Sequence, residues 1–329
     1  MKYDFIAIGD MMVDAFVRLK DASVSFDSLK DEWKISMPFK DKIPYEEMYV
    51  IPAVGNSPNA AVCAARLGLK TALVSDIGGD HWGKECLEVL RTEKISKDFI
   101  RIHKEKKTNY HYVLWYEDDR TILIKHEKFE YALPKIDSPK WIYLSSLGED
   151  SLGYHKQIEE YLLKNPEIKL AFQPGTFQIK FGYEKLAGIY KRTEIFFCNR
   201  EEAGHILGKN NEDIRELLHS INALGPKIVV ITDGPAGAYI YETGQIYFMR
   251  SYPDIKPPLE RTGAGDAFSA TFTSALALGT NVLEAMKWAP INSMSVVQKI
   301  GARAGLLRRE ELERYLKIAP SDYLPKLLN

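Results

Sequence analysis

The amino-acid sequence predicts an α/β protein with a doubly wound, mostly parallel sheet, helices on both faces of that sheet and a small additional β-sheet. Short apolar runs alternate with helical periodicity along most of the 329 residues, which is typical of parallel βαβ units. Two segments, residues 14–53 and residues 108–126, break this alternation. We expect strands from these segments to pair as the small sheet and to cover one end of the core as a lid.

The α/β pattern begins with an expected buried strand at residues 3–9 (YDFIAIG). Residues 58–67 (PNAAVCAARL) carry small apolar side chains at helical spacing, so we expect a helix that is packed on several sides. A strand at residues 71–75 (TALVS) and a helix near residues 82–91 follow. The later part of the chain repeats the pattern, with strands expected at residues 141–144, 168–172, 194–198 and 227–231 and a helix at residues 212–223.

The segment at residues 108–126 (TNYHYVLWYEDDRTILIKH) is predicted to form two strands around a turn at residues 117–120. The segment at residues 14–53 is mixed in character and contains Pro38, Pro44 and Pro52. The sequence shows neither an internal repeat nor a low-complexity linker, which favours a single domain over residues 1–329.

Charge and cysteine content argue against several classes of protein. Lys+Arg 44 nearly balance Asp+Glu 45, and the net charge of -1 does not favour nucleic acid or an anionic membrane as a partner. Cys63, Cys86 and Cys198 are far apart and lack metal-binding spacing, which favours a reducing compartment. The apolar runs are too short for a signal peptide or a membrane span. We therefore expect a cytoplasmic protein, and we interpret its 7 histidines as surface or satisfied core residues.

The stretch RTGAGDAF, residues 261–268, leads two glycines directly into an apolar helix. Gly263 and Gly265 permit positive φ and a close approach to the main chain. A helix that begins near Ala264 offers free N–H groups and the positive end of its dipole to an anion. A phosphate held there would place Asp266 beside an attacking hydroxyl, whose proton it could accept. The structural alternative is a tight helix entry capped by Asp266, and this stretch alone leaves both interpretations open.

Residues 262–268 (TGAGDAF) resemble the C-terminal signature of the ribokinase (PfkB) carbohydrate-kinase family. Residues 55–61 (GNSPNAA), with residues 65–68 (ARLG), resemble its N-terminal signature, and the similarity extends from residues 9–10 to residues 301–305. The resemblance implies a ribokinase-like α/β domain with a β-lid. It also implies transfer of the γ-phosphoryl group of ATP to a hydroxyl, usually a hydroxymethyl, of a sugar or nucleoside.

The resemblance assigns catalytic and substrate-binding roles residue by residue. The catalytic residues that it implies are the base Asp266 and the anion hole of Gly263, Ala264 and Gly265. The substrate-binding residues that it implies are Asp14, Gly55, Asn56 and Asn59. A carboxylate can accept two hydroxyl hydrogen bonds, which suits a sugar. The structural alternatives are a turn aspartate at position 14 and a helix cap at position 56.

The resemblance also implies where ATP and Mg²⁺ bind. The residues that it assigns to the nucleotide are Asn199, Glu202, Thr232, Gly234, Gly237 and Thr262. Asn199 and Glu202 match a motif that organises Mg²⁺ through water, although the same pair would also form a helix-capping box. Three positions depart from the family: Val54 precedes Gly55 where paired glycines are common, Gln173 replaces an asparagine, and Glu260 replaces an aspartate of a monovalent-cation site. The use of a monovalent cation is therefore left open.

The function that we expect is an ATP- and magnesium-dependent kinase acting on a sugar or sugar derivative. One alternative is a nucleoside kinase of the adenosine type, because aromatic side chains of the lid could stack on a base; they are Tyr110, Tyr112, Trp115 and Tyr116. The other alternative is a catalytically silent sugar- or nucleotide-binding protein, against which the retention of Asp266 argues. The expected partner is a small molecule rather than nucleic acid or a membrane, and a homodimer formed through the lid is left open.

Overall fold

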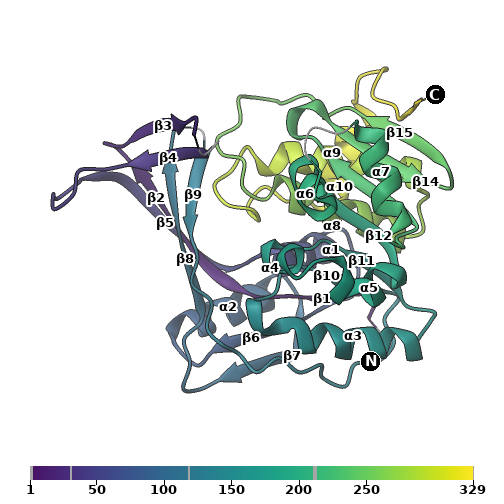
Figure 1. The fold of residues 1–329 in the computed structure, drawn as a ribbon, viewed down its shortest axis with the longest axis horizontal. Coiled ribbons are helices and arrows are strands. Elements are labelled where there is room, and N and C mark those ends of the chain that lie inside the picture. Colours follow the sequence, from purple (N-terminus) through teal and green to yellow (C-terminus); the bar gives the residue numbers. More distant parts are fainter. Residues whose placement is uncertain (1–2, 30–31, 118, 210–212, 329) are drawn as a thin grey trace.

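A ten-stranded sheet lies at the centre of the computed structural model, which describes residues 3–29, 32–117, 119–209 and 213–328 (Figure 1). In spatial order its strands are β16 (Lys326–Leu328), β15 (Gln245–Met249), β14 (Ala238–Glu242), β13 (Ile228–Thr232), β12 (Thr193–Asn199), β11 (Lys169–Phe172), β10 (Trp141–Leu144), β1 (Phe5–Ile8), β6 (Thr71–Gly78) and β7 (Ser96–His103). The strands from β13 to β7 are parallel, and β14, β15 and β16 extend the sheet in antiparallel pairing. The carboxyl ends of the parallel strands therefore share one edge, where ligands bind in open α/β sheets.

Helices cover both faces of this sheet, because buried strands alternate their side chains between two apolar cores. In β1, Phe5 and Ala7 belong to one core and Ile6 and Ile8 to the other. The first core also contains residues of α1 (Asn56–Arg66), α2 (His81–Thr92), α8 (Ala264–Ala277), α9 (Val282–Val296) and α10 (Arg309–Lys317). The second core contains residues of α3 (Leu152–Lys164), α5 (Tyr183–Arg192), α6 (Arg200–Leu207) and α7 (Ile214–Ala223), with α4 (Thr176–Phe181) packed beside it. The predicted fold class is confirmed.

The predicted elements of the core are present with their ends shifted by a few residues. The helix expected at residues 212–223 is α7, which begins at Ile214, and position 212 lies outside the described residues. The sequence did not reveal β7 or β16, the two edge strands of the sheet. Both mix charged and apolar residues, SKDFIRIH in β7 and KLL in β16, since an edge strand is only partly covered.

The second sheet contains β5 (Tyr45–Val54), β2 (Met12–Leu19), β8 (Asn109–Tyr116) and β9 (Asp119–Leu123), in that spatial order. Its strands thus come from the two segments that break the βα alternation. Position 118 of the expected turn lies outside the described residues. Two short strands, β3 (Ser23–Asp27) and β4 (Glu32–Ser36), form a separate antiparallel pair. Figure 1 shows the second sheet standing away from the helix-covered core, with β9 on the side nearest to it.

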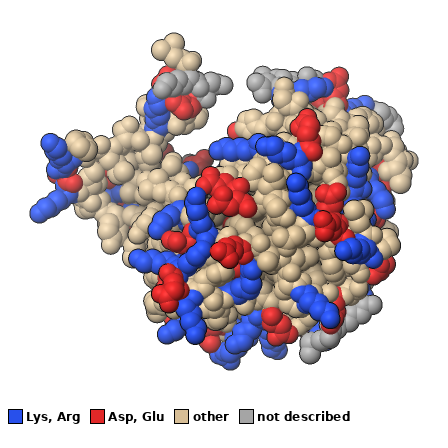
Figure 2. All heavy atoms as spheres, turned by 60° about the horizontal axis from the view of Figure 1, so that its bottom comes forward, with Lys and Arg blue, Asp and Glu red and all other residues tan. Residues whose placement is uncertain are grey.

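The surface carries both signs of charge. Figure 2 shows Lys and Arg side chains interspersed with Asp and Glu side chains on one face of the molecule, which agrees with the net charge of -1. Within the described ranges, every helix is too short or too polar to cross a bilayer. The organisation of residues 1–329 as a single domain stays a prediction.

Candidate active site

Asp266 lies in the first turn of α8, where three side-chain amides surround its carboxylate. Asn56 Nδ2 donates to Asp266 Oδ1 at 2.7 Å, and Asn59 Nδ2 donates to Oδ2 at 2.9 Å. Gln173 Nε2 also donates to Oδ1, at 3.2 Å. Burial raises the pKa of Asp266 above its ordinary value, and the three hydrogen bonds to the carboxylate offset part of that increase. The site therefore holds an oriented carboxylate whose basicity is raised.

The entry to α8 depends on glycine at position 263. Gly263 has a φ of 81°, and a Cβ atom there would lie 2.2 Å from Ala302 Cβ. Gly265, by contrast, faces open space, with no atom within 4 Å of a Cβ built on it. Ser293 Oγ donates to the carbonyl oxygen of Ala264 at 2.8 Å and so fixes the first turn. The N–H groups at the start of a helix lack intrahelical partners, so this turn presents an anion site directly beside Asp266.

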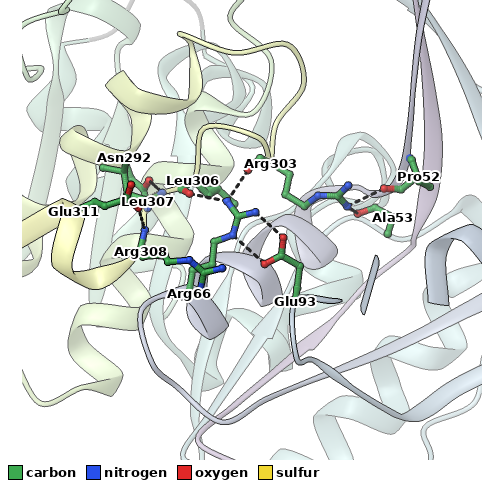
Figure 3. Close-up of polar contacts among 10 residues, drawn as sticks. All are labelled: Pro52, Ala53, Arg66, Glu93, Asn292, Arg303, Leu306, Leu307, Arg308 and Glu311. Atoms are coloured by element: carbon green, nitrogen blue, oxygen red, sulfur yellow. Dashed lines mark hydrogen bonds and ion pairs between the residues drawn. The ribbon is translucent and has the colours of Figure 1, made fainter. Parts of the chain in front are cut away.

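The loop that carries Ala302 is held in place by two arginines (Figure 3). Arg66 Nη1 donates to the carbonyl oxygens of Arg303 and Leu306 at 3.1 and 2.6 Å. The same guanidinium binds both carboxylate oxygens of Glu93, at 3.0 and 2.6 Å. Arg303 Nη1 in turn donates to the carbonyls of residues 52–53 in β5. These contacts fix the loop against α1, α2 and β5, and so fix the wall against which Gly263 packs.

Two adjoining clefts open beside the start of α8. The larger has a volume of about 500 Å³ and is lined by the predicted residues Thr232, Gly234 and Gly237 together with apolar side chains that include Tyr252 and Phe268. The smaller has a volume of about 270 Å³ and is lined by a predominantly polar set that includes the predicted residues Asn56, Asn199, Glu202, Gly263, Gly265 and Asp266. Four residues line both clefts: Arg120, Thr232, Arg261 and Gly265. An apolar cleft joined to a polar one suits a heterocyclic base that carries phosphates.

Asn199 and Glu202 form a capping box at the start of α6 and also line the smaller cleft. Asn199 Oδ1 accepts from the N–H of Glu202, and Glu202 Oε2 accepts from the N–H of Asn199, both at 2.8 Å. Burial raises the pKa of Glu202, and the Asp266 charge adds to that increase. Among the described residues that line this cleft, Glu202 and Asp266 carry the carboxylates. These two carboxylates suit Mg²⁺, which commonly takes one or two carboxylates along with water and phosphate oxygens.

Thr262 and Glu260 lie next to the clefts rather than in their walls. The N–H of Thr262 donates to Glu260 Oε2 at 2.7 Å, and the N–H of Gly301 donates to Oε1 at 2.8 Å. The Thr262 hydroxyl is buried without a hydrogen-bond partner. The nucleotide role assigned to Thr262 therefore stays a prediction. Glu260 is a buried carboxylate that uses both oxygens to hold the backbone on either side of the Gly263 turn.

Asp14 and Gly55 lie on the side of Asp266 that faces the second sheet. Gly55 has a φ of 120°, and a Cβ atom there would lie 2.7 Å from the carbonyl oxygen of Asp10, so glycine lets the start of α1 approach the end of β1. Asp14 is on β2, where its carboxylate approaches His111 Nδ1 at 3.6 Å. Burial raises the pKa of Asp14 to about 7, and the charges of Asp266 and Glu260 contribute.

The strand β8 places His111 on one face of the second sheet and Tyr110 and Tyr112 on the other. Its register pairs His111 with Asp14 and Tyr110 with Val13, and neighbouring positions of a strand point to opposite faces. Tyr110 packs against Trp82 and Tyr112, with ring centroids 5.5 and 5.3 Å apart. These two tyrosines therefore lie on the face that is turned away from Asp14.

Several residues of the site were not found from the sequence. His111 Nε2 and Asn109 Nδ2 are buried without hydrogen-bond partners, so the interpretation of His111 as a satisfied core residue was wrong. The available signal was the pair of polar residues, Asn109 and His111, at alternate positions of the otherwise apolar strand β8. Gln173 directly follows the carboxyl end of β11, a position where site residues gather. Arg120, in contrast, reaches both clefts from β9, which only the tertiary structure shows.

The chain is similar to known proteins in sequence and in fold. The model of the pfkB carbohydrate kinase family matches residues 37–309 of the chain. The chain is 28% identical to an uncharacterized sugar kinase of Archaeoglobus fulgidus over 74% of this chain and 98% of that protein. It is 25% identical to a nucleoside kinase of Methanothermobacter thermautotrophicus over 77% of this chain and 80% of that protein. The structure of Arabidopsis thaliana ribokinase complexed with ribose and ATP matches with a TM-score of 0.79 at 20% identity, covering 96% of this chain and 99% of that one.

Proposed function

The chain belongs to the pfkB family of carbohydrate kinases, and from this premise we propose that it transfers the γ-phosphoryl group of ATP to a hydroxyl, preferably a hydroxymethyl, of a sugar or sugar derivative. The observation that carries the proposal is the Asp266 carboxylate, held by three amides in the wall of the smaller cleft, next to Gly265, which lines both clefts. The larger cleft would hold the nucleotide, and the smaller its terminal phosphates.

Asp266 acts in this proposal as the general base. Its Oδ1 already accepts two amide hydrogen bonds, whereas Oδ2 accepts one, so we assign Oδ2 as the atom that receives the proton of the acceptor hydroxyl. The hydroxyl oxygen forms its bond to the γ-phosphorus as the bond from that phosphorus to the bridging oxygen of ADP breaks. The raised pKa of Asp266 brings the base closer to the operating pH, which favours proton transfer.

Charge on the transferred group would be balanced by the start of α8 and by two arginines. Gly263 and Gly265 line the smaller cleft, so the backbone N–H groups of the first turn would serve it as an anion hole, and no atom lies within 4 Å of a Cβ built at Gly265. Arg120 and Arg261 line both clefts, so their side chains lie where β- and γ-phosphates would be. Mg²⁺ supplies further neutralisation of phosphate charge when it is bound, and Glu202 would hold it through water.

A nucleoside kinase is the second candidate, because one of the relatives above is a nucleoside kinase. The position of the aromatic side chains argues for a sugar instead. Tyr110 and Tyr112 lie on the face of β8 opposite Asp14, where they could not stack on a base held by that carboxylate. Trp115 lies on the same face as Asp14 but packs against the guanidinium of Arg18, at 4.9 Å from the ring centroid.

Two further properties belong to the proposal. We propose a cytoplasmic location, which is supported by three free cysteines, all of them buried. We also propose a homodimer formed through the lid, the strands of residues 14–53 and 108–126, which include the separate pair β3–β4. The pair β3–β4 supports it, since it exposes Trp33 at 73% and Phe26 at 48% of their surface, and large exposed apolar side chains in one place mark interaction surfaces.

The test is ADP release from Mg-ATP across a panel of free sugars, sugar phosphates, sugar acids and nucleosides. Release that one class of acceptor stimulates, together with a product heavier by one phosphoryl group in mass spectrometry, supports the proposal. If ATP binds but no acceptor stimulates its turnover, the kinase assignment fails and a binding role takes its place.

A further inference from the structure

We infer that the acceptor is an uncharged polyhydroxylated compound, a free sugar or polyol, and that Asn109 and His111 of β8 select it. The inference rests on the kinase function proposed above and names its substrate class. It follows from the hydrogen-bonding groups and the charges that the second sheet and α1 bring to the neighbourhood of Asp266.

Of the buried polar atoms without a hydrogen-bond partner, four lie on β2, β8 and α1: Asp14 Oδ1, Asn59 Oδ1, Asn109 Nδ2 and His111 Nε2. Three of them are contiguous, because β2 pairs with β8 so that Asp14 lies opposite His111 and Met12 opposite Asn109. The amide nitrogen of Asn59 is bound to Asp266, which leaves its oxygen as the free end. Buried polar groups are rarely left unpaired without a ligand or water, so four together mark a binding wall.

The chemistry of the four atoms fits hydroxyl groups. Asp14 Oδ1 and Asn59 Oδ1 are acceptors as an ionised carboxylate and an amide oxygen, and Asn109 Nδ2 is a donor. His111 Nε2 can donate or accept, depending on its tautomer. A hydroxyl both donates and accepts, so adjacent hydroxyls of a sugar can satisfy all four. A phosphate or carboxylate group in contact with these atoms offers acceptors alone and would leave Asp14 and Asn59 without donors.

The charges of the wall disfavour an anionic group in contact with it. Asp14 lies within the fields of Asp266 and Glu260, both of which raise its pKa. His111 faces it as a neutral ring, because burial and the neighbouring His126 lower the pKa of His111 to about 4. A phosphorylated or carboxylated acceptor placed here would therefore meet repulsion in a poorly solvated space.

A second carboxylate lies behind this wall. Asp10 is buried and accepts hydrogen bonds from Tyr131 Oη at 2.9 and 3.0 Å. His126 Nδ1 approaches its other side at 3.3 Å, and the His111 and His126 rings are 5.2 Å apart. Within the described part of the chain, the ion pairs of Asp10 and Asp14 are formed with histidines and none with Lys or Arg. The second carboxylate adds to the negative potential that an anionic acceptor would meet.

The experiment compares acceptors that share a carbon skeleton but differ in charge. The pairs are ribose with ribose 5-phosphate, fructose with fructose 6-phosphate, and glucose with gluconate, and kcat/KM is measured for each with Mg-ATP. The expected result is that the uncharged member of the productive pair is used at least about 100-fold better. Turnover of a phosphorylated or carboxylated member alone would overturn this inference and leave the kinase proposal standing. Turnover with none of them, nor with any nucleoside, would overturn both.

Variants of β8 test the wall itself. His111→Phe removes the ring nitrogens and is expected to raise KM for the productive acceptor about 10- to 100-fold while kcat changes much less. His111→Gln keeps a polar end and is expected to recover part of that loss. Tyr112→Phe is the matched control, since Tyr112 neighbours His111 in sequence but lies on the opposite face, and its KM should equal that of the wild type. An unchanged KM in the folded His111→Gln and His111→Phe proteins, checked by thermal unfolding, would overturn the inference.

Discussion

Three carboxylates act on one another at the site. Asp14 is buried, and the charges of Asp266 and Glu260 oppose its ionisation. Glu260 is compensated by two backbone N–H groups and Asp266 by three amides. Asp14 Oδ1 has no hydrogen-bond partner, and His111 Nδ1 approaches it no closer than 3.6 Å. An ionised Asp14 therefore destabilises the free protein, and hydrogen bonds from bound hydroxyls would reduce this destabilisation.

This charge predicts that Asp14→Asn stabilises the free protein at high pH. The folded pKa of about 7 lies above the ordinary value of 3.8, so ionisation of Asp14 costs more in the folded state. The wild type consequently loses stability from this group as the pH rises from 4 to 7. In urea unfolding, we expect the variant to gain on the order of 2–4 kcal/mol at pH 8 and almost nothing at pH 4.

Asp4→Asn provides a control of opposite sign. The hydrogen bond from Lys140 is the main cause of a lowered pKa at Asp4, so its ionised form stabilises the folded state at pH values above the ordinary pKa of the group. That variant should lose a small amount of stability at pH 8 and none at low pH. A gain for Asp14→Asn that is the same at pH 4 and pH 8 would contradict the account of Asp14.

We expect the amide of Gln173 to lower the pKa of the base, Asp266. Its hydrogen bond lowers the pKa of Asp266, so Gln173→Met, which removes the amide at similar length, should raise that pKa. The acid limb of the kcat profile should then move to higher pH, with kcat reduced several-fold at pH 6 and nearly unchanged at pH 8.5. Steady-state kinetics with saturating acceptor measures both profiles. If the two profiles have the same shape, Gln173 does not act through Asp266.

Among the elements, the start of α8 carries the most specific backbone requirement. Gly263 and Gly279 both have positive φ, at 81° and 93°, so alanine at either position costs about 1 kcal/mol of backbone strain. A Cβ at position 263 would also lie 2.2 Å from Ala302 Cβ, whereas position 279 has no atom within 4 Å. We expect Gly279→Ala to lower the free energy of unfolding by about 1 kcal/mol and Gly263→Ala by roughly 2–4 kcal/mol, since overpacking adds 1–3 kcal/mol.

Denaturant unfolding and kcat together check this prediction. Gly263→Ala should also lose most of its activity, because the first turn of α8 must shift away from the loop that the two arginines hold. Gly279→Ala should keep full activity at the far end of the same helix. Equal losses of stability in the two variants would mean that the contact with Ala302 imposes no constraint.

The elements of the core could be predicted because each is marked by its own local sequence. Short apolar runs bounded by turns placed β1, β6, β10 and β13 within a few residues, and the small apolar residues of α1 marked a helix buried on several sides. The edge strands could not be predicted in the same way, because partial exposure removes the apolar signal. The two segments that form the second sheet were found by their departure from the βα pattern.

The candidate site could be predicted only in part, because its contacts join distant positions. Family resemblance pointed to Asp266, Asn56 and Asn59 separately, but their hydrogen bonds cross 207 and 210 residues of sequence. Local spacing contains no information about such a contact. For the same reason the sequence assigned Asn56 and Asn59 to the substrate and did not show that both also hold the base. Arg120 was overlooked as a turn residue, since only the folded second sheet brings it to the clefts.

At the scale of the whole molecule, the β3–β4 pair of the lid is expected to mediate self-association. Trp33 and Phe26 pack on each other with ring centroids 5.2 Å apart, and both are largely exposed. Trp33→Glu should place a charge in that apolar contact and shift the protein from dimer to monomer in light scattering across micromolar concentrations. Ser36→Glu, at an exposed position on the opposite face of β4, is the charge control. A wild type that is monomeric throughout this range would contradict the proposed dimer.

The central claim is that Asp266 removes the proton from the acceptor, and Asp266→Asn tests it most directly. We predict that kcat for the best acceptor falls by at least about 10³-fold, while ATP binding measured by calorimetry and the melting temperature stay near those of the wild type. Asp4→Asn, the same chemical change at the opposite end of the sheet, should leave kcat unchanged. A folded Asp266→Asn enzyme that retains kcat within a few-fold of the wild type would contradict the claim.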